Sequence, residues 1–258
     1  MKIGFIQYDV SRTPQENIDK LEKFMSCREC DTVLMPELSM SGYLFENRSE
    51  LMNCAENVPE GTSTQTIIDL SKKYSRTVIF GIAEKDSDNI YNTAVVVSCG
   101  KYIGKYRKIH LSDLEKKFFD RGEENRVFTV NGINIGVQIC FDLWFPEVSR
   151  EQIRMGADIL FVLANFGGDT TYRISELRAV ENLTPLVLCN RIGKESVSSM
   201  DAEFLGKSTA VDACGKRIVT AEENKEYFGV CDIEIPEKKA YVICGDFDSE
   251  IAIHYPKL

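Results

Sequence analysis

The chain of 258 residues is 43% hydrophobic and 28% charged, and its formal net charge at pH 7 is -9. This is an ordinary globular composition with enough apolar material for a sizeable core, and the length fits one large domain. A surface this acidic argues against nucleic acid and anionic membranes as partners, because both are bound by clustered lysine and arginine. No apolar run is long enough to span a membrane and MKIGFIQYDV lacks a signal-peptide layout, so we expect a soluble, cytoplasmic protein.

Short runs rich in β-branched and aromatic residues recur along the chain and predict strands. Several of them are apolar on both faces, as strands covered by other layers must be. In chain order the runs are 2–8, 32–37, 77–84, 91–98, 133–140, 157–165, 185–190 and 208–213. The dipeptide Asn131-Gly132, between RVFTV and INIGV, is a strong hairpin signal. The pattern therefore predicts mixed sheets, with antiparallel hairpins beside strand–helix–strand units.

Helical patterns fill some of the intervals between these runs. The clearest begins at residues 13–16, Thr-Pro-Gln-Glu, which have the spacing of a capping box and a proline at the first helical position. Its apolar residues lie on one stripe: Ile18, Leu21, Phe24 and Met25. Further helices are predicted over 63–74, 146–155 and 172–183. Because no repeat, low-complexity tract or long linker interrupts the chain, we expect residues 1–258 to form a single α/β domain.

The cysteines raise the question of a metal or redox site. In a chain without a secretion signal, most are expected to be reduced and buried as small hydrophobes. Cys27 and Cys30 form a C-x-x-C pair, but no second ligand pair stands at a suitable spacing, and the pair closes a predicted helix. A zinc or thiol-redox site is therefore the weaker interpretation. The nine cysteines are Cys27, Cys30, Cys54, Cys99, Cys140, Cys189, Cys214, Cys231 and Cys244.

Three segments that follow or close predicted strands carry reactive side chains. They are MPELSMSGY with Glu37, KYRKIHL with Lys108 and GVQICFDLWFPE with Cys140. Strand ends in α/β sheets are favoured positions for catalytic residues. Each residue alone has an ordinary interpretation, as a cap or ion pair, as part of an exposed edge strand, or as a buried spacer. Together, a carboxylate, an ammonium and a thiol at three strand ends point to covalent catalysis by cysteine.

The thiol needs help from its neighbours, because a free cysteine has a pKa of about 8.5 and is mostly protonated at neutral pH. Glu37 can take its proton, and the Lys108 ammonium can lower its pKa. Histidine would be the usual base, but the chain has only His110 and His254, and His254 lies outside any motif. A cysteine–histidine enzyme is therefore the weaker hypothesis.

The three segments that carry Glu37, Lys108 and Cys140 resemble the signatures of the nitrilase, or carbon–nitrogen hydrolase, superfamily. PELSMSGY, YRKIHL and GVQICFDLWFPE are similar to its three signature segments, and GADILFVLANF, RAVENLTPLVLCNRIG and FLGKSTAVDACGK to its later blocks, in the same order. The resemblance implies an αββα sandwich with mixed sheets that is usually paired across a dimer interface, so we expect a homodimer or higher homo-oligomer. It also implies hydrolysis of a non-peptide carbon–nitrogen bond in a small linear amide, with no metal or organic cofactor.

The resemblance also assigns catalytic residues. The family's Glu–Lys–Cys triad corresponds to Glu37, Lys108 and Cys140, and Glu115 is the best match for a further glutamate that the family needs. In the implied mechanism Glu37 accepts the thiol proton while Lys108 and the backbone N–H of Phe141 hold the oxyanion. The acyl group then forms a thioester with Cys140, and water hydrolyses it. Glu115 would position Lys108 or the substrate.

Aromatic residues near the thiol are expected to form the substrate pocket. Tyr43, Trp144 and Phe166 are the candidates, with core packing as the alternative, which for Phe166 is equally supported. Trp144 stands where many relatives have arginine, so a substrate with a free carboxylate at that point is disfavoured. Arg178 and Glu181 are expected to form an ion pair. Structural roles are expected for six polar residues: Asp142, Glu147, Arg178, Glu181, Asn190 and Arg191.

The substrate stays open within this class. An amidase that releases ammonia from a linear amide, such as an ω-amidase or amino-acid amidase, is the first hypothesis, and an N-carbamoyl amide hydrolase is the second. Nitrile hydrolysis is less favoured, because those relatives tend to carry C-terminal extensions. A catalytically silent binding protein of the same fold is the alternative from another class, and the intact triad argues against it.

Overall fold

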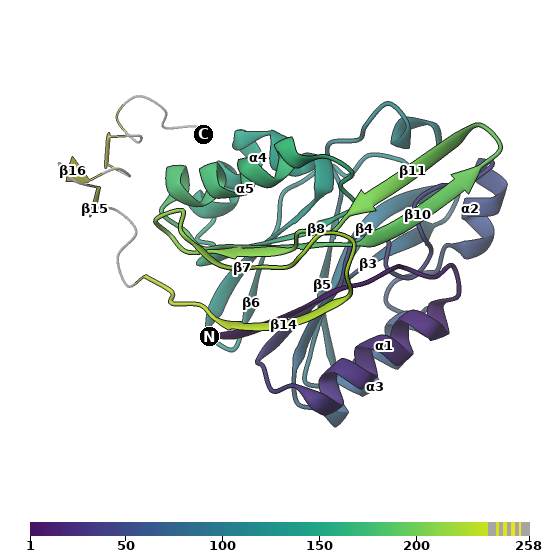
Figure 1. The fold of residues 1–258 in the computed structure, drawn as a ribbon, viewed down its shortest axis with the longest axis horizontal. Coiled ribbons are helices and arrows are strands. Elements are labelled where there is room, and N and C mark those ends of the chain that lie inside the picture. The colour runs from purple at the N-terminus through teal and green to yellow at the C-terminus, as the bar shows by residue number, and fades with distance from the viewer. Residues whose placement is uncertain (237–240, 243–244, 247–248, 251–252, 254–258) are drawn as a thin grey trace.

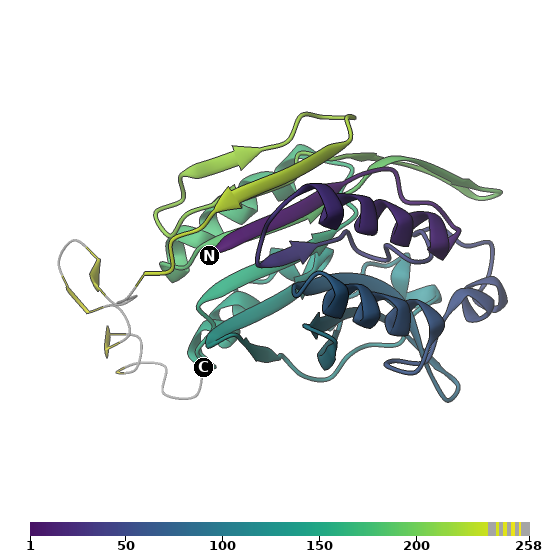
Figure 2. The same ribbon diagram turned by 90° about the horizontal axis from the view of Figure 1, so that it is seen from below.

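The computed structural model describes residues 1–236, 241–242, 245–246, 249–250 and 253; Cys244 and His254 lie outside this part. Within it, two six-stranded sheets stack against each other. Helices cover the outer face of each sheet, so the layers follow the order helix, sheet, sheet, helix (Figures 1 and 2). The predicted αββα sandwich with mixed sheets is confirmed.

The first sheet carries the N-terminal half of the chain. Its strand order is β14 (Tyr227–Asp232), β1 (Lys2–Gln7), β2 (Thr32–Leu34), β3 (Thr77–Asp86), β4 (Asn89–Ser98) and β5 (Lys101–Arg107). The pairs β1–β2 and β2–β3 are parallel, and the other pairs are antiparallel. Helices α1 (Pro14–Cys27) and α3 (Thr62–Lys73) lie side by side over its outer face (Figure 2).

The second sheet has the same mixed character. Its strand order is β13 (Arg217–Thr220), β12 (Thr209–Val211), β9 (Leu186–Asn190), β8 (Ile159–Ala164), β7 (Ile133–Ile139) and β6 (Val127–Val130). Strands β7, β8 and β9 are parallel. Helices α4 (Pro146–Arg154) and α5 (Asp169–Asn182) connect them and cover the outer face (Figure 1).

Smaller elements surround the sandwich. Helix α2 (Arg48–Cys54) and the hairpin of β10 (Ile192–Val197) and β11 (Met200–Leu205) extend beyond the two sheets at the same end of the molecule (Figure 1). The remaining elements are the 3₁₀ segments η1 (Glu115–Lys117) and η2 (Cys140–Trp144) and the short strands β15 (Tyr241–Val242) and β16 (Gly245–Asp246).

Alternation along the strands divides the core into layers. Ile3, Phe5 and Ile79 point between the sheets and meet residues such as Val137 and Phe161 of the second sheet. Their strand neighbours point outward, where Ile6 and Phe80 belong to the cluster beneath α1 and α3. A further cluster lies beneath α4 and α5. Strands covered on both faces must be apolar on both, which explains the continuous apolar runs in the sequence.

Each predicted strand and helix has a counterpart, with shifted ends. The strand predicted over 32–37 ends at Leu34. The Asn131-Gly132 turn joins β6 to β7, and both residues have positive φ, 51° and 80°, as the hairpin prediction requires. Helix α1 begins at Pro14, but the Thr13 side chain makes no capping hydrogen bond. The capping box was therefore a wrong prediction, although the helix start was right.

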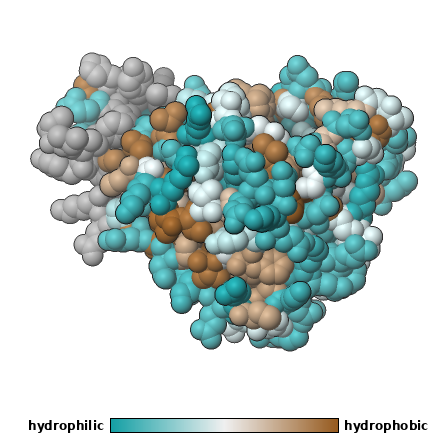
Figure 3. Space-filling model, viewed as in Figure 1, coloured by the Kyte–Doolittle hydropathy of each residue, from teal (hydrophilic) through white to brown (hydrophobic). Residues whose placement is uncertain are grey.

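The surface fits the acidic, polar composition. The face seen in Figure 3 is mainly hydrophilic, with apolar patches among the polar side chains. None of the helices in the described residues is long and apolar enough to cross a membrane. Among the residues that the structure describes, the exposed large hydrophobic side chains are Trp144, Met155, Leu177, Val180, Met200, Ile218 and Ile253.

Candidate active site

The four residues predicted to be catalytic come from four separate segments, and one of them, Lys108, contacts two of the others directly. Lys108, immediately after β5, donates from Nζ to Oε1 of Glu37 at 2.8 Å and to Oε1 of Glu115 at 2.6 Å. Glu37 lies in the turn after β2, and Glu115 begins η1. Cys140 is the first residue after β7, in the other sheet. All four side chains are buried, so their charges interact with little screening.

Asn92 on β4 completes the cluster, and the sequence analysis missed it. Its Nδ2 donates to Oε1 of Glu37 at 2.7 Å and to Oε1 of Glu115 at 3.1 Å. Its backbone carbonyl accepts from the backbone N–H of Lys108 at 2.8 Å, which fixes the end of β5. The one available signal was a polar asparagine inside the apolar run YNTAVVV.

The turn that carries Glu37 is held against β3. Leu38 has a φ of 47°, and the Ser39 hydroxyl donates to the carbonyl of Gly81 at 3.0 Å. A Cβ at Gly81 would lie 2.3 Å from the backbone nitrogen of Leu38, so only glycine allows this approach. The close contact places the Glu37 carboxylate deep in the sandwich.

Cys140 stands on a strained turn that Asp142 holds. Its φ is 49°, in the left-handed region that non-glycine residues rarely adopt. Oδ2 of Asp142 accepts from the Ile139 backbone N–H at 3.1 Å and from the Tyr106 hydroxyl at 2.8 Å. Oδ1 accepts from the His110 backbone N–H at 2.9 Å. The structural role predicted for Asp142 is therefore confirmed.

His110 belongs to the support of this turn. Its ring stacks on Phe145 with centroids 3.8 Å apart, and its Nδ1 lies 3.2 Å from Oδ1 of Asp142. The ring therefore packs against the back of the turn, which disfavours a cysteine–histidine mechanism.

The two glutamates of the cluster have pKa values shifted in opposite directions. Burial alone would lower the pKa of Lys108, but the carboxylates of Glu115 and Glu37 raise it well above its usual range. Burial would raise the pKa of Glu115, but the Lys108 ammonium outweighs it and lowers that pKa. At Glu37 burial prevails, and the pKa is raised. Glu115 is thus the ionised partner of Lys108, while Glu37 is the more basic carboxylate.

The thiol needs a base. Burial, followed by the charge of Glu37, raises the pKa of Cys140 well above its usual value, against the opposing Lys108. Among the described residues, Oε2 of Glu37 is buried without a hydrogen-bond partner, so it is free to accept a proton. The arrangement can therefore support nucleophilic attack by a cysteine with a glutamate as general base.

The predicted pocket residues differ in burial. Tyr43 packs its ring edge-on against Phe204, with centroids 5.9 Å apart, and Phe166 is partly buried beside the core. Phe141 is half-buried, and its ring meets Phe145. Trp144 is 41% exposed, and its indole N–H donates to the Thr171 hydroxyl at 3.3 Å. Trp144 therefore borders solvent, and its place in the pocket stays a prediction.

Asn165, one residue before Phe166, was not predicted. Its backbone hydrogen-bonds to Cys140. Its side chain is buried, and both polar atoms are without a hydrogen-bond partner in the described part of the chain. Buried amides are normally paired, so these atoms are candidates to contact a bound substrate.

Arg178 and Asn190, two of the residues predicted to be structural, form buried contacts, whereas Glu147 lies in the first turn of α4 and is exposed. Arg178 donates to the backbone carbonyls of Leu143 at 2.9 Å and Trp144 at 3.0 Å, and it lies 3.1 Å from Glu181. The predicted Arg178–Glu181 ion pair is present, and it braces the segment that follows Cys140. Asn190 spans from the Phe166 backbone to the Gly206 carbonyl.

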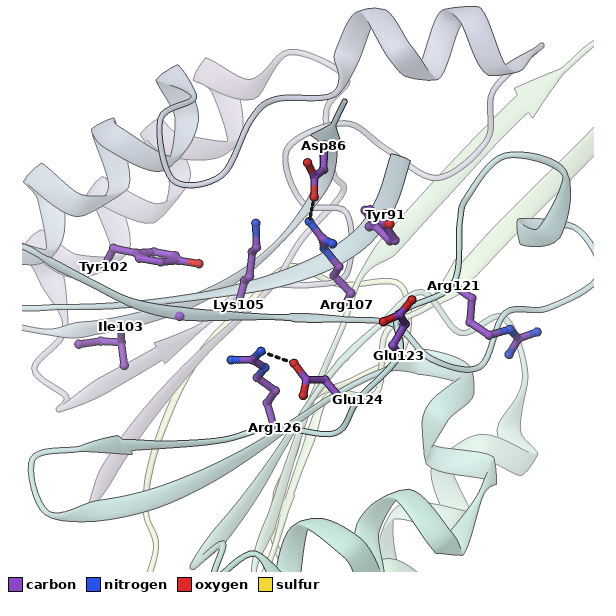
Figure 4. A pocket seen from close by; sticks show the side chains of 12 residues that line it. Asp86, Tyr91, Tyr102, Ile103, Lys105, Arg107, Arg121, Glu123, Glu124 and Arg126 are labelled. Carbon is purple, nitrogen blue, oxygen red and sulfur yellow. Dashed lines mark hydrogen bonds and ion pairs between the residues drawn. The ribbon is translucent and has the colours of Figure 1, made fainter. Parts of the chain in front are cut away.

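A cavity of about 560 Å³ lies away from this cluster, along β5 and the segment 121–126 (Figure 4). Figure 4 shows Arg107 paired with Asp86 and Arg126 with Glu124. Its wall therefore largely balances its own charges, and none of the predicted catalytic residues lines it.

The two cysteines of the C-x-x-C pair lie in different surroundings. Cys27 ends α1 and is exposed, whereas Cys30 is buried in the core beneath that helix. In the described ranges, no group of three histidine, cysteine or acidic residues could hold a metal ion.

Comparison with known proteins identifies the family. The family model for "Carbon-nitrogen hydrolase" matches residues 2–241. A nitrilase of Pyrococcus abyssi is 36% identical, over 91% of this chain and 90% of that protein. A 2-oxoglutaramate amidase of Bacillus subtilis is 32% identical, over 87% and 86%.

Solved structures share the fold. Nit3 of Saccharomyces cerevisiae, a nitrilase-superfamily member, superposes with a TM-score of 0.79 at 23% identity, over 100% of this chain and 95% of that chain. An amidase from Nesterenkonia gives 0.76 at 22% identity, over 89% of each chain. The chain belongs to the carbon–nitrogen hydrolase family of the nitrilase superfamily, and it is a hydrolase of carbon–nitrogen bonds.

Proposed function

We propose that the protein hydrolyses a small linear amide to a carboxylic acid and ammonia through a thioester on Cys140. The observation that carries this proposal is the buried Lys108, which donates to both Glu37 and Glu115 while one oxygen of Glu37 stays unpaired among the described residues. A cation that lies between two carboxylates leaves one negative charge in excess, and the free oxygen of Glu37 makes that charge available as a base.

Acylation begins with the thiol. Oε2 of Glu37 takes the proton from Cys140 as its sulfur forms a bond to the amide carbon. The carbonyl oxygen becomes negative, and the Lys108 ammonium and the Phe141 backbone N–H stabilise it. When this intermediate collapses, Glu37 delivers the proton to the nitrogen, the carbon–nitrogen bond breaks, and ammonia leaves.

Deacylation reverses the proton movement. Glu37 accepts a proton from water, and the hydroxide attacks the thioester carbon. The second intermediate expels the thiolate, which recovers the proton from Glu37. Glu115 stays ionised throughout and keeps Lys108 charged and in place. Its carboxylate accepts hydrogen bonds from the Lys108 ammonium at 2.6 Å and from the Ser112 backbone N–H at 2.9 Å.

The names of the relatives support amides as substrates. One is a 2-oxoglutaramate amidase, and another is an (R)-stereoselective amidase of Pseudomonas, 29% identical. N-carbamoyl amides are the second candidate, because a relative from rice, 26% identical, is named N-carbamoylputrescine amidase. Nitriles are a weaker third, from the name of the Pyrococcus relative.

The surface and the cysteines support two further parts of the proposal. Leu177 and Val180 of α5 are 60% and 45% exposed, which fits burial against a second copy in a homodimer. The eight cysteines in the described residues are all free, which fits a reducing, cytoplasmic location.

The test is ammonia release from a panel of amides, N-carbamoyl compounds and nitriles, with the Cys140→Ala variant as control. We expect wild type to release ammonia from a primary amide and Cys140→Ala to be slower by at least about 10³-fold while it remains folded. Substantial turnover by Cys140→Ala would overturn the thioester mechanism. A wild type that hydrolyses only N-carbamoyl compounds would favour the second candidate.

A further inference from the structure

A second buried ion pair lies at the base of the β10–β11 hairpin. Arg191 contacts Glu195 through Nη1, and the two side chains are only 1% and 8% exposed. Nη2 of Arg191 also lies 3.1 Å from Oδ1 of Asp9 and donates to the Val10 carbonyl at 3.1 Å. A buried ion pair is a poor source of stability, because desolvation offsets most of its attraction. This pair therefore calls for another explanation.

The Glu195 carboxylate forms hydrogen bonds with the backbone of the loop that follows Glu37. Its Oε2 accepts from the backbone N–H of Tyr43 at 2.9 Å and of Leu44 at 2.8 Å. Gly42 has a φ of 77°, and a Cβ there would lie 3.1 Å from Oε1 of Glu195. The loop is therefore moulded around this carboxylate, and Arg191 fixes the carboxylate in turn.

The hairpin also holds the Tyr43 ring. Phe204 of β11 meets this ring edge-on at 88°. The Arg191 guanidinium lies 4.4 Å from the centroid of the Phe204 ring. Tyr43 is thus fixed twice by the same hairpin, through its backbone by Glu195 and through its ring by Phe204.

The Tyr43 hydroxyl lies within the field of the catalytic cluster. Burial raises its pKa well above the usual value, and the charges of Glu115, Glu37 and Cys140 add to the rise, with Lys108 opposing. Tyr43 also lies in the loop that follows Glu37, so a shift of its backbone would move a polar group that interacts with the charges of the catalytic cluster. Displacements of about 1 Å can cost an enzyme roughly 10²-fold.

We propose that Glu195 is a positioning residue that sets the substrate pocket by holding Tyr43. The β10–β11 hairpin then acts as a support for substrate recognition, and Arg191 serves to orient Glu195. This inference rests on the proposed amide hydrolysis, because its effect is read through that activity.

The experiment is a double-mutant cycle with Glu195→Gln and Tyr43→Phe. Glutamine keeps the shape but places an amide NH₂ beside either the Tyr43 N–H or Arg191. We expect Glu195→Gln to raise KM about 10-fold and to lower kcat less than about threefold. A merely structural role would reduce the fraction of folded enzyme and so lower kcat at unchanged KM. Tyr43→Phe should have a similar effect on KM, and the double variant should lose no more than about threefold beyond the worse single variant.

Asp9→Asn is the matched control. It removes another carboxylate partner of the same Arg191 but leaves the acceptor of the Tyr43 N–H in place. We expect its kcat and KM to stay within about twofold of wild type. A KM increase for Asp9→Asn as large as that for Glu195→Gln would overturn the proposal.

Thermal unfolding of each variant separates positioning from stability. If Glu195→Gln does not fold, Phe204→Leu tests the same support through the ring, and it should raise KM and be non-additive with Tyr43→Phe. Additive effects in an active wild-type background would overturn this inference alone. An inactive wild type, or an active Cys140→Ala variant, would overturn the proposed function and this inference with it.

Discussion

Two ion clusters, each with a buried carboxylate, lie at the end of β5, and the charges that surround these carboxylates differ. Lys105 and Arg107 both contact the buried carboxylate of Glu84, and Arg107 also pairs with the exposed Asp86, so two cations surround one buried anion. One residue further along the chain, Lys108 lies between Glu37 and Glu115, so two anions share one cation.

The pKa of the central carboxylates follows this balance. Burial would raise the pKa of Glu84, but hydrogen bonds from Arg107, Lys105 and Thr93 outweigh it and lower that pKa. Both oxygens of Glu84 have partners. Burial keeps the pKa of Glu37 raised, and within the described residues its Oε2 has no partner. A carboxylate whose two oxygens both have hydrogen-bond partners stabilises the structure, whereas a carboxylate with one unpartnered oxygen can accept a proton.

The largest effect should separate the two lysines. We expect Lys108→Met to lower kcat/KM by at least about 10³-fold, because it removes the proposed oxyanion contact and leaves two buried carboxylates facing each other. Lys105→Met should stay within about threefold, since Arg107 still neutralises Glu84. Steady-state kinetics on the best amide of the panel gives both values. Equal losses would show that the two clusters act as one.

A charge-neutral substitution at Glu115 should change the pH profile. Glu37 is a base only when it is ionised, so activity falls as the pH drops through its pKa, which burial and Glu115 raise above 4.5. Glu115→Gln removes one source of that rise, so the acidic limb of kcat/KM should move to lower pH, while kcat drops about 10²-fold because Lys108 is less well held. Glu124→Gln, on the wall of the cavity in Figure 4, is the control. A limb that moves upward would exclude Glu37 as the base.

Asn92 should shift the same limb in the opposite direction. Burial raises the pKa of Glu37, and the hydrogen bond from Asn92 partly opposes this rise. Asn92→Leu removes that hydrogen bond, so the limb should move to higher pH, with kcat/KM about 10-fold lower at neutral pH. The pH profile compared with that of wild type is the measurement. An unchanged limb would mean that Asn92 acts only by shape.

The sequence predicted the reactive residues better than their surroundings. Glu37, Lys108 and Cys140 each follow a strand. Strand ends and the resemblance to a family can both be recognised in the sequence alone. Pro36 offers no N–H, so the strand before Glu37 ends at Leu34, earlier than the apolar run suggests. Pro36 was therefore a local signal for this strand end, and the length of the apolar run overrode it in the prediction.

The supporting residues could not be predicted, because their roles arise from contacts between distant segments. Asn92 is 55 positions from Glu37, and Glu195 is 152 positions from Tyr43. The β10–β11 hairpin also escaped prediction, because its strands are largely exposed and have no apolar run. Arg191 was expected to be structural, but its partners appear only once the hairpin is folded.

The smallest effect on activity is expected at Glu84, where the loss should appear in stability. Breaking a buried, paired carboxylate costs about 3 kcal/mol, so Glu84→Gln should be that much less stable near neutral pH. The pKa of Glu84 is lowered on folding from its usual 4.5, so its contribution is complete above that value and is lost as pH falls through the lower, folded pKa. The stability gap between wild type and Glu84→Gln in urea unfolding should therefore narrow as the pH falls below 4.5.

Activity of this variant completes the comparison of the two clusters. Because Glu84 is saturated with hydrogen bonds and holds Lys105 and Arg107 rather than Lys108, kcat/KM at neutral pH should stay within about threefold of wild type. A folded Glu84→Gln protein that has lost its activity would mean that the end of β5 transmits strain to Lys108. The cluster around Glu84 would then be part of the catalytic apparatus. The balance of charge alone would not distinguish it from the cluster around Lys108.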